Sequence, residues 1–533
     1  MSSPIAPDYG QRFLFPPELE DWISLDHPAR FIREFVDQLD LGALGFAMPA
    51  GMEGRPPYAP SLHLKIWLYG YFNRIRSTRK LEAACTEHLP LLWLTGMIAP
   101  DHNSLWRFWR DNKKALRGVF KQTVELALRT GAVGLGLQAL DGTKIAAAAS
   151  SPAGWSKDFM EQTLAALDAA LDDTELRIAQ ENSVSTNEPA SRLPAGLAAR
   201  QALREQIKQG LAQLQADGRK HYHPVEPEAR RMKVGQGNQY AYNAQALADE
   251  KEGIVVACDV GRQENDCGQL APMIEQAREN TGAASAPLTV ADTGYGSGAD
   301  IKAAADAGQP VLVPPFKGGA KNDHAYSIHH FHFDPAARTV TCPQKRQLDH
   351  EGHTINEGVR IERYRCHCRD CPVRAQCTRD PKGRQIEIYP HTAETQVMRE
   401  LLKTPAQAAL LSRRREIIEK LFGHIKQHDG FRRWTVWGLD AVHTQWSIIC
   451  ATFNLRVLYG KWKRSQPTQY GPLGVGQFFS RKASAGLRTL CFWIKQPVTT
   501  AFWTLSPSLF QRRDVFTAWL RPHHFPLTPG KYF

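Results

Sequence analysis

Short apolar runs of strand length recur between residues 134 and 314, and segments with helical periodicity separate them. A chain that alternates in this way is expected to form a mixed α/β domain, because helices must cover the faces of the shared sheet. Two of the runs end directly at an aspartate, at Asp141 and Asp292. The apolar runs lie at 134–140, 239–246, 253–260, 287–291 and 310–314.

Two segments are predicted to be insertions into this α/β region. Residues 158–218 carry Leu and Ile at spacings of three and four, which predicts two helices joined by the polar stretch 181–195. Residues 316–395 are rich in Cys, His and Arg. Long helices are then predicted at about 404–428 and 438–460.

The flanking regions complete a three-part organisation. Residues 1–130 are predicted to form a helical N-terminal domain that binds DNA, in which Asp101 caps a helix and Trp106 and Trp109 belong to the core. The α/β domain covers 131–460. Residues 461–533 form a basic, aromatic tail to which the sequence assigns no structure.

The net charge of +12 indicates a polyanionic partner, and its distribution indicates where contact occurs. Residues 401–533 contain 20 Lys and Arg but only 5 Asp and Glu, whereas the first 400 residues contain 46 and 49. A basic excess confined to the last quarter of the chain favours a surface that contacts phosphates. The sequence contains no signal peptide and no uninterrupted apolar stretch of about 18 residues, so a cytoplasmic, nucleoid-associated protein is expected, without a membrane partner.

Each candidate carboxylate has an ordinary structural explanation when it is taken alone. Asp141 precedes Gly142, which is typical of a turn, and Asp292 could cap a helix. Glu419 shares a narrow helix face with Arg415 and Lys426, since at about 100° per residue the three lie within about 40° of one another. A solvated face with an Arg–Glu pair would look the same.

Together the three carboxylates suit phosphoryl transfer with two metal ions. Such chemistry needs hard oxygen ligands around two divalent ions that lie about 3.5–4 Å apart. Asp141 and Asp292 at neighbouring strand ends, with Glu419 on a flanking helix, can converge in this way.

The chain resembles the DDE transposases of bacterial insertion sequences over residues 10–460. Their third-carboxylate helix carries Tyr-x2-Arg-x3-Glu-x6-Lys, and this chain has Arg415-x3-Glu419-x6-Lys426, with Ser412 at the Tyr position. Glu416 is the competing candidate, but it lacks the matching offsets. Similar blocks occur at 54–58, 68–71, 76–81, 100–104, 140–144, 242–245, 265–270 and 291–295.

The resemblance implies an RNase H-like catalytic core, with Asp141, Asp292 and Glu419 as catalytic residues and ligands of two Mg²⁺ ions, for which Mn²⁺ can substitute. It also implies binding to the element's terminal inverted repeats, strand cleavage by water, and attack of a 3′-hydroxyl on target DNA. A homodimer in a paired-end complex is implied as well. The alternatives are an inactive DNA-binding remnant and an RNase H-like nuclease.

Five of the ten cysteines lie between Cys342 and Cys377, a clustering that in a cytosolic protein indicates a metal site rather than disulfides. Four thiolates would complete a structural zinc site, and reduced thiols in a loop-rich insertion are the alternative. The predicted zinc ligands are Cys342, Cys368, Cys371 and Cys377, with Cys366, His367, His350 and His353 as alternatives.

A basic and aromatic segment follows the helix of Glu419. Arg432 and Arg433 are predicted to contact the DNA backbone, as are Arg415 and Lys426. Trp437 is expected to be a core residue at a junction between helices.

Overall fold

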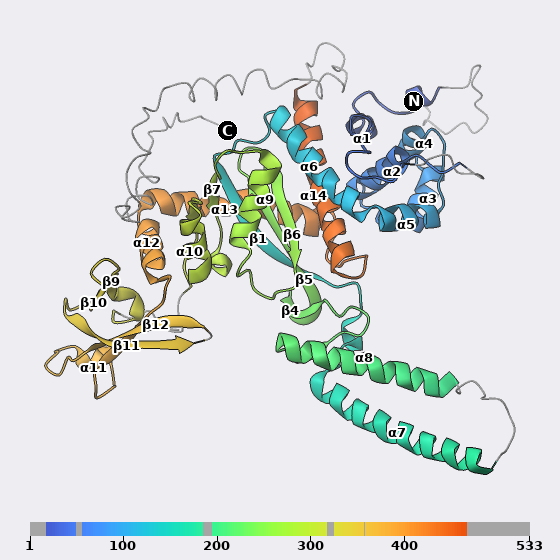
Figure 1. The fold of residues 1–533 in the computed structure, drawn as a ribbon. Helices are drawn as coiled ribbons and strands as arrows, with labels where there is room; N and C mark the ends of the chain where they lie inside the picture. Colours follow the sequence, from blue (N-terminus) through green and yellow to red (C-terminus); the bar gives the residue numbers. More distant parts are fainter. Residues whose placement is uncertain (1–17, 49–55, 185–194, 317–324, 357, 466–533) are drawn as a thin grey trace, which may run out of the picture.

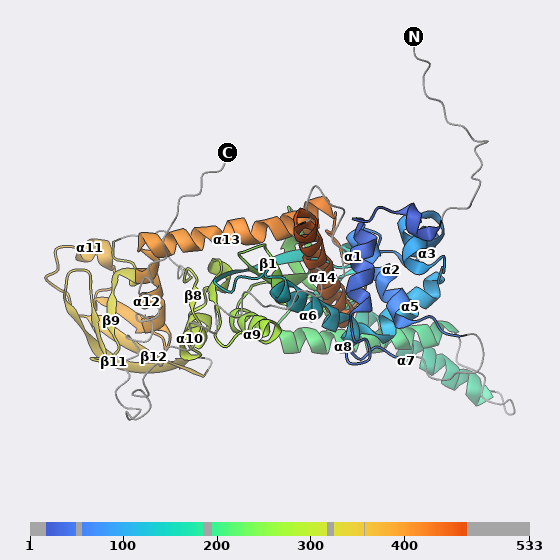
Figure 2. The ribbon, with the colours of Figure 1, turned by 90° about the horizontal axis from the view of Figure 1, so that it is seen from above.

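The computed structural model describes residues 18–48, 56–184, 195–316, 325–356 and 358–465. The molecule is elongated, with the N-terminal helices at one end, a mixed sheet in the middle and a small antiparallel sheet at the other end (Figures 1 and 2). Most of the predicted tail 461–533 lies outside the described residues. Within those residues, no helix is long and apolar enough to cross a membrane.

The N-terminal region is entirely helical, as its periodicity predicted. Asp101 caps α5 by accepting the backbone N–H groups of Asn103 and Ser104, each at 2.9 Å. Trp109 is buried against Trp67, with ring centroids 4.8 Å apart. The elements are η1 (Leu19–Trp22), α1 (Pro28–Asp37), α2 (Pro60–Phe72), α3 (Thr78–Glu87), α4 (Leu89–Thr95), α5 (His102–Asp111) and α6 (Lys113–Arg129).

The central sheet has the strand order β6-β5-β1-β7-β8, with β4 also pairing with β5. Strand β5 is antiparallel to β1 and β6, whereas β7 is parallel to both β1 and β8. This arrangement confirms the predicted RNase H-like fold. The strands are β1 (Leu137–Ala146), β4 (Arg230–Val234), β5 (Gly237–Asp249), β6 (Val255–Gly261), β7 (Leu288–Val290) and β8 (Val311–Leu312).

Helices cover this sheet, and α14 is the most deeply buried of them. The Trp446 indole donates to the Gln245 carbonyl at 2.8 Å, and the Asn454 amide pairs with both backbone groups of Val255. Helix α14 is buried over most of its surface, and its buried side chains include polar ones that form hydrogen bonds within the core. The covering helices are α9 (Leu270–Thr281), α10 (Gly298–Asp306), α13 (Pro405–Gly423) and α14 (Leu439–Arg464).

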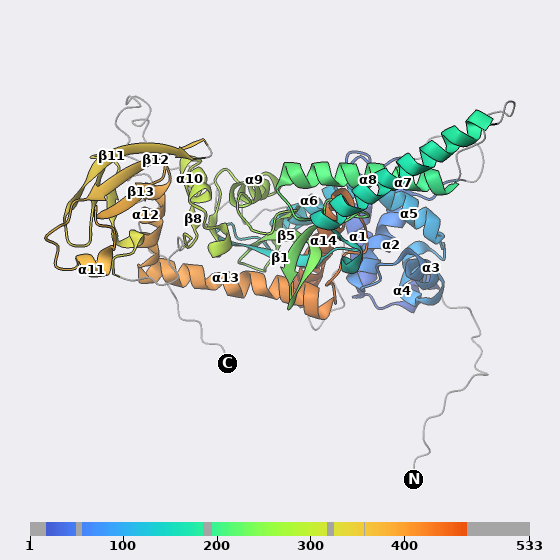
Figure 3. The same ribbon diagram turned by 90° about the horizontal axis from the view of Figure 1, so that it is seen from below.

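Two antiparallel helices, α7 (Lys157–Val184) and α8 (Ala195–Asp217), project from the sheet (Figures 1 and 3). They lie where the sequence predicts a helical hairpin. Their base is the short ribbon of β2 (Trp155–Ser156) and β3 (His221–Tyr222). Met160, Ile207 and Leu214 form a small core between the helices, separate from the main core.

The Cys-rich region forms a second, antiparallel sheet that the sequence did not predict. Its order is β13-β12-β11-β10-β9, and the helices α12 (Thr392–Leu402) and α13 lead from it back to the central sheet (Figure 2). The remaining elements are β9 (His332–Asp334), β10 (Thr339–Thr341), β11 (Gln347–Asn356), β12 (Val359–Cys366), α11 (Arg374–Cys377) and β13 (Arg384–Ile388).

Candidate active site

Asp141 lies in the middle of β1, which continues to Ala146 instead of ending at Asp141 as predicted, and Asp292 lies two residues after the parallel strand β7. Ala139 of β1 pairs with Val290 of β7, so the residues two positions further on, Asp141 and Asp292, follow at the same edge. Asp292 also accepts the backbone N–H of Gly294 at 2.7 Å and thereby caps the short helix η3 (Thr293–Tyr295). Asp292 can therefore both cap this short helix and belong to the candidate active site.

The carboxyl group of Asp141 lies in an environment that disfavours its charge. Burial raises its pKa, the Arg414 guanidinium lowers it and the Asp292 carboxylate raises it, with a resulting pKa of about 6. The Arg414 Nη1 atom lies 2.7 Å from Asp141 Oδ2, and the two side chains are only 17% and 20% exposed. One guanidinium therefore does not compensate for burial beside a second carboxylate, and a site of this kind favours a further cation.

Arg414 is a residue that the sequence analysis missed. The family motif contains Arg415, but that side chain is exposed, whereas Arg414 donates a hydrogen bond to Asp141. The buried Ile418 follows Arg414 by four residues, and the buried Leu421 follows Ile418 by three. Arg414 therefore lies on the packed face of α13. That spacing was a usable signal, since it extends the apolar stripe of the helix by one position.

Glu419 is exposed on α13, and its carboxylate makes no hydrogen bond or ion pair with any described residue. The structure therefore brings Asp141 and Asp292 together but does not join Glu419 to them by a direct contact. Along the helix, Glu419 lies between Arg414 and Lys426. Burial and the nearby Arg432 lower the pKa of Lys426, and Asp141 raises it, so Lys426 also lies within electrostatic reach of Asp141.

The helix of Glu419 continues into a π-helical turn, η5 (His424–His428), which contains Lys426. In the following segment, Arg432 donates to the Gln427 side chain at 2.7 Å and to the Lys426 carbonyl at 3.3 Å. Arg433 donates to the carbonyls of Ala147 and Ala149, just beyond β1, so it also ties this segment to the sheet.

Two of the expectations about tryptophan burial are wrong. Trp437 is 62% exposed and Trp106 is 44% exposed, whereas both were expected to be core residues. Their neighbours Trp434 and Trp109 fill the core positions instead, each with 1% exposure. Aromatic pairs two or three residues apart on short segments do not reveal which member faces inward.

A polar network beside the two aspartates was also missed. The side-chain amides of Asn243 and Gln245 both donate to Asp266 Oδ1 at 2.8 Å. The Tyr295 hydroxyl donates to the side-chain oxygen Oε1 of Gln245. Burial raises the pKa of Tyr295 well above its usual range, and the Asp266, Asp141 and Asp292 carboxylates raise it further. Tyr295 therefore stays protonated as a hydrogen-bond donor.

The cysteines of the second region gather around one small cavity of about 20 Å³, roughly the space of a single ion or water. Arg346 donates its backbone N–H to Cys342 Sγ at 3.3 Å. Among the alternative ligands, His350 instead pairs with Glu362 at 2.8 Å. The cysteines that line the cavity are Cys342, Cys366, Cys368, Cys371 and Cys377.

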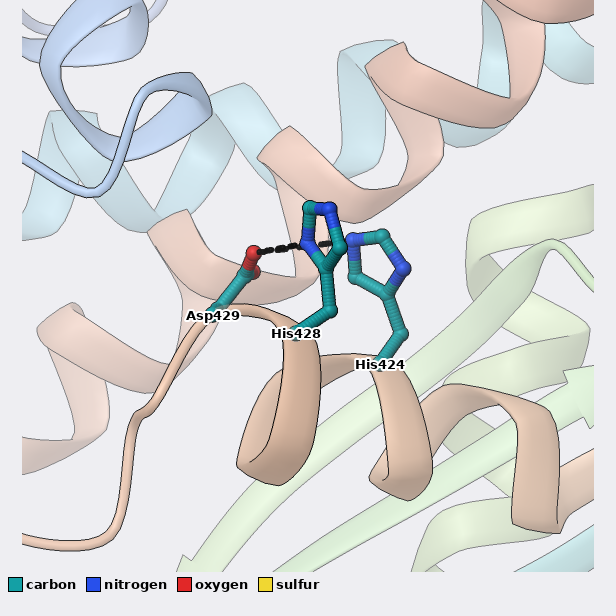
Figure 4. A group of neighbouring side chains, drawn as sticks. All are labelled: His424, His428 and Asp429. Atoms are coloured by element: carbon teal, nitrogen blue, oxygen red, sulfur yellow. Dashed lines mark hydrogen bonds and ion pairs between the residues drawn. The ribbon is translucent and has the colours of Figure 1, made fainter.

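A different group of potential metal ligands lies after α13, where one ligand atom from each of His424, His428 and Asp429 falls within 4.8 Å of the others (Figure 4). The Asp429 side chain is only 7% exposed and already pairs with Arg456 at 2.6 Å and with His428 at 2.9 Å. The Asp429 carboxylate therefore already has an ion-pair partner and a hydrogen-bond partner within the protein.

Arginines from two segments, the α2–α3 connection and α14, surround this group. Arg76 donates to the Asp429 carbonyl at 2.6 Å, and Arg74 lies 2.7 Å from His428 Nε2. With the Arg456 guanidinium also present, a divalent cation would be repelled. The group is better described as a polar junction that joins the α2–α3 connection, the end of α13 and α14.

The raised pKa of Asp141 predicts a stability effect. Because the folded protein holds this proton more tightly than the unfolded chain, stability falls as pH rises from about 4 to about 6, and the loss above pH 6 is about 3 kcal/mol. We therefore expect Asp141→Asn to unfold at a higher temperature than wild type at pH 7.5 in EDTA. The gain should vanish near pH 4, and equal stability at pH 7.5 would contradict it. Glu416→Gln, at an exposed position, is the control.

Two family models match the chain. One described as a transposase domain matches residues 17–111, which cover the N-terminal helices as far as α5. One described as a transposase DDE domain matches residues 341–459, which include the Cys-rich sheet, Glu419 and most of α14. No curated protein matches the chain. The two matches, a helical transposase domain followed by a transposase DDE domain, indicate an insertion-sequence transposase of the DDE type.

Proposed function

We propose that this transposase binds the terminal inverted repeats of its element and catalyses metal-dependent DNA cleavage and strand transfer. The observation that carries the proposal is the pair of carboxylates, Asp141 and Asp292, at the same edge of two parallel strands. Burial, with a smaller contribution from the Asp292 charge, raises the pKa of Asp141 to about 6, a value at which a cation can readily replace the proton.

The residues at this edge suit Mg²⁺, or Mn²⁺ in its place, because carboxylate oxygens are the ligands that these hard ions prefer. Two bound ions would activate the attacking water or 3′-hydroxyl and stabilise the leaving oxygen. DDE transposases in general use divalent metal ions. Asp141 and Asp292 would hold the ions, and Arg414 would hold Asp141 in place until they bind.

Glu419 is the proposed third carboxylate. Its support is its position between Arg414 and Lys426, which both reach towards Asp141, and its Arg-x3-Glu-x6-Lys spacing. The exposure of its side chain leaves it accessible to DNA and metal. Glu416 lies about 60° around the helix from Glu419 and lacks the matching offsets.

The DNA contacts are proposed to involve Arg415, Lys426, Arg432 and Arg433. Arg415 and Arg432 are exposed, so they suit contacts with DNA phosphates. Arg433 is partly committed to backbone carbonyls, so its substitution should also loosen the segment after β1. The N-terminal helices are proposed to bind the repeats, and two copies to act together in a paired-end complex.

We also propose a structural zinc ion held by Cys342, Cys368, Cys371 and Cys377, with Cys366 as the alternative ligand. The ion-sized cavity between these thiols supports the proposal. Purified protein is expected to contain about one zinc per chain, and Cys371→Ser to lose it, because three thiolates hold the ion less firmly than four. Metal analysis by mass spectrometry measures this. Cys267→Ser, outside the cluster, is the control. A zinc-free wild type or a zinc-loaded Cys371→Ser variant would contradict the proposal.

The experiment that tests the proposed function incubates wild-type protein and Mg²⁺ with DNA that carries the element's ends, taken from the sequence flanking the gene. End-specific nicks together with joined products support a transposase. Nicks without joining would indicate an RNase H-like nuclease. Binding without either product would indicate an inactive DNA-binding remnant.

A further inference from the structure

Asp266 lies in the connection between β6 and α9, outside the three carboxylates considered so far. Its Oδ1 atom accepts two amide hydrogen bonds of 2.8 Å, from Asn243 and Gln245. Within the described part of the chain, no residue donates a hydrogen bond to its Oδ2 atom. One oxygen of this carboxylate is therefore fixed, while the other is left for a different partner.

Two glycines show where the carboxylate of Asp266 lies. A Cβ atom at position 142 would lie 2.6 Å from Asp266 Oδ1, and a Cβ atom at position 294 would lie 2.7 Å from Asp266 Oδ2. The same Cβ at position 294 would lie 2.9 Å from Asp292 Oδ1. Asp266 therefore extends between the residue after Asp141 and the loop after Asp292, and oxygens of Asp266 and Asp292 border one small space.

The residues that orient Asp266 are rigidly held. Asn243 and Gln245 lie on β5 opposite Lys144 and Gly142 of β1, and both are buried, at 2% and 0% exposure. The Tyr295 hydroxyl fixes the Gln245 amide by donating to its carbonyl oxygen. Three polar side chains are thus arranged to hold one carboxylate at one angle, as the supporting residues of a catalytic site do.

We propose that Asp266 is a further carboxylate of the active site, with its Oδ2 atom serving as a ligand for a divalent ion that Asp292 also binds. This inference rests on the proposed metal-dependent function. Asn243 and Gln245 are then positioning residues, because they act through Asp266. Gly142 and Gly294 are required because any side chain there would fill the space that the carboxylates border.

Isothermal titration of metal-free protein with Mn²⁺ tests the proposal in the absence of DNA. Asp266→Asn keeps the shape of the side chain and an acceptor oxygen for the two amides but removes the charge. We expect its dissociation constant for Mn²⁺ to rise about tenfold or more. Glu264→Gln, at an exposed position two residues away, should bind as wild type does. Unchanged binding by Asp266→Asn would overturn the proposal.

Mn²⁺ binding by Asp141→Asn distinguishes a failure of the proposed role of Asp266 from a failure of the proposed metal site. If Asp141→Asn weakens Mn²⁺ binding and Asp266→Asn does not, only the role of Asp266 is wrong. If neither variant weakens binding, the metal site proposed at Asp141 and Asp292 is wrong as well.

A second measurement uses the wild-type chain and does not depend on how the variants fold. Fe²⁺ bound in place of Mg²⁺, with ascorbate and hydrogen peroxide, generates radicals that cut the backbone next to the ion. Cuts near residues 141, 266 and 292 are expected. Cuts near 141 and 292 without any near 266 would overturn the proposal.

Discussion

Glu419→Gln is expected to lose metal-dependent strand cleavage by about three orders of magnitude or more, and Glu416→Gln to cleave at close to the wild-type rate. The two substitutions make the same chemical change, three residues apart on the exposed side of α13. Glutamine keeps the size of the side chain but removes the charge that a divalent ion needs. Only the change at Glu419 should therefore affect catalysis.

Single-turnover cleavage of DNA bearing the element's ends measures this difference, and a gel-shift assay establishes that both variants still bind. Because Glu419 makes no hydrogen bond or ion pair with a described residue, its substitution should leave the unfolding temperature unchanged. Cleavage by Glu419→Gln, together with its loss in Glu416→Gln, would reverse the assignment of the third carboxylate.

Asp429→Ala is expected to lower the free energy of unfolding by about 3–5 kcal/mol, because it leaves buried guanidinium charge without a counterion. The Asp429 side chain is 7% exposed, and its partner Arg456 is 13% exposed. Arg456 also donates to the carbonyls of Tyr71 and Phe72, so the junction ties α14 to the N-terminal helices. Its loss should loosen the contact between the two transposase domains.

Asp440→Ala is the matched control for this effect. Asp440 also pairs with two basic residues of the N-terminal region, Lys113 and Arg117, both at 2.6 Å, but its side chain is 58% exposed. Exposed pairs of this kind contribute about 1 kcal/mol or less. Denaturant unfolding of both variants would contradict the account if the two losses were equal.

The sequence was sufficient to predict the parts of the site that local patterns encode. Asp141 and Asp292 each follow an apolar run, and these runs form the adjacent parallel strands β1 and β7. The predicted strand end at Asp141 is wrong, because β1 continues to Ala146 in its pairing with β5. The RNase H-like fold followed from the resemblance, and the strand order bears it out. The long helices were predicted because their apolar stripes continue over several turns.

Other parts depend on contacts between distant segments and could not be predicted. The position of Asp266 is set by amides of β5 and by a loop that follows β7, more than 20 residues away on either side. The second sheet was missed because β11 is mostly exposed and shows no alternation of apolar and polar residues. Arg414 was not predicted because the family motif contains the neighbouring Arg415 instead.

Asp141, within β1, and Asp292, just after β7, are proposed to bind the divalent ions that support DNA cleavage. Asp292→Cys tests this proposal most directly, because a thiolate is a softer ligand that favours Mn²⁺ over Mg²⁺. The account predicts that this variant is inactive in Mg²⁺ and regains cleavage in Mn²⁺, with a ratio of the two rates shifted at least about tenfold from that of wild type. Equal activity in the two metals, at the wild-type ratio, would contradict a direct role of Asp292 in metal binding.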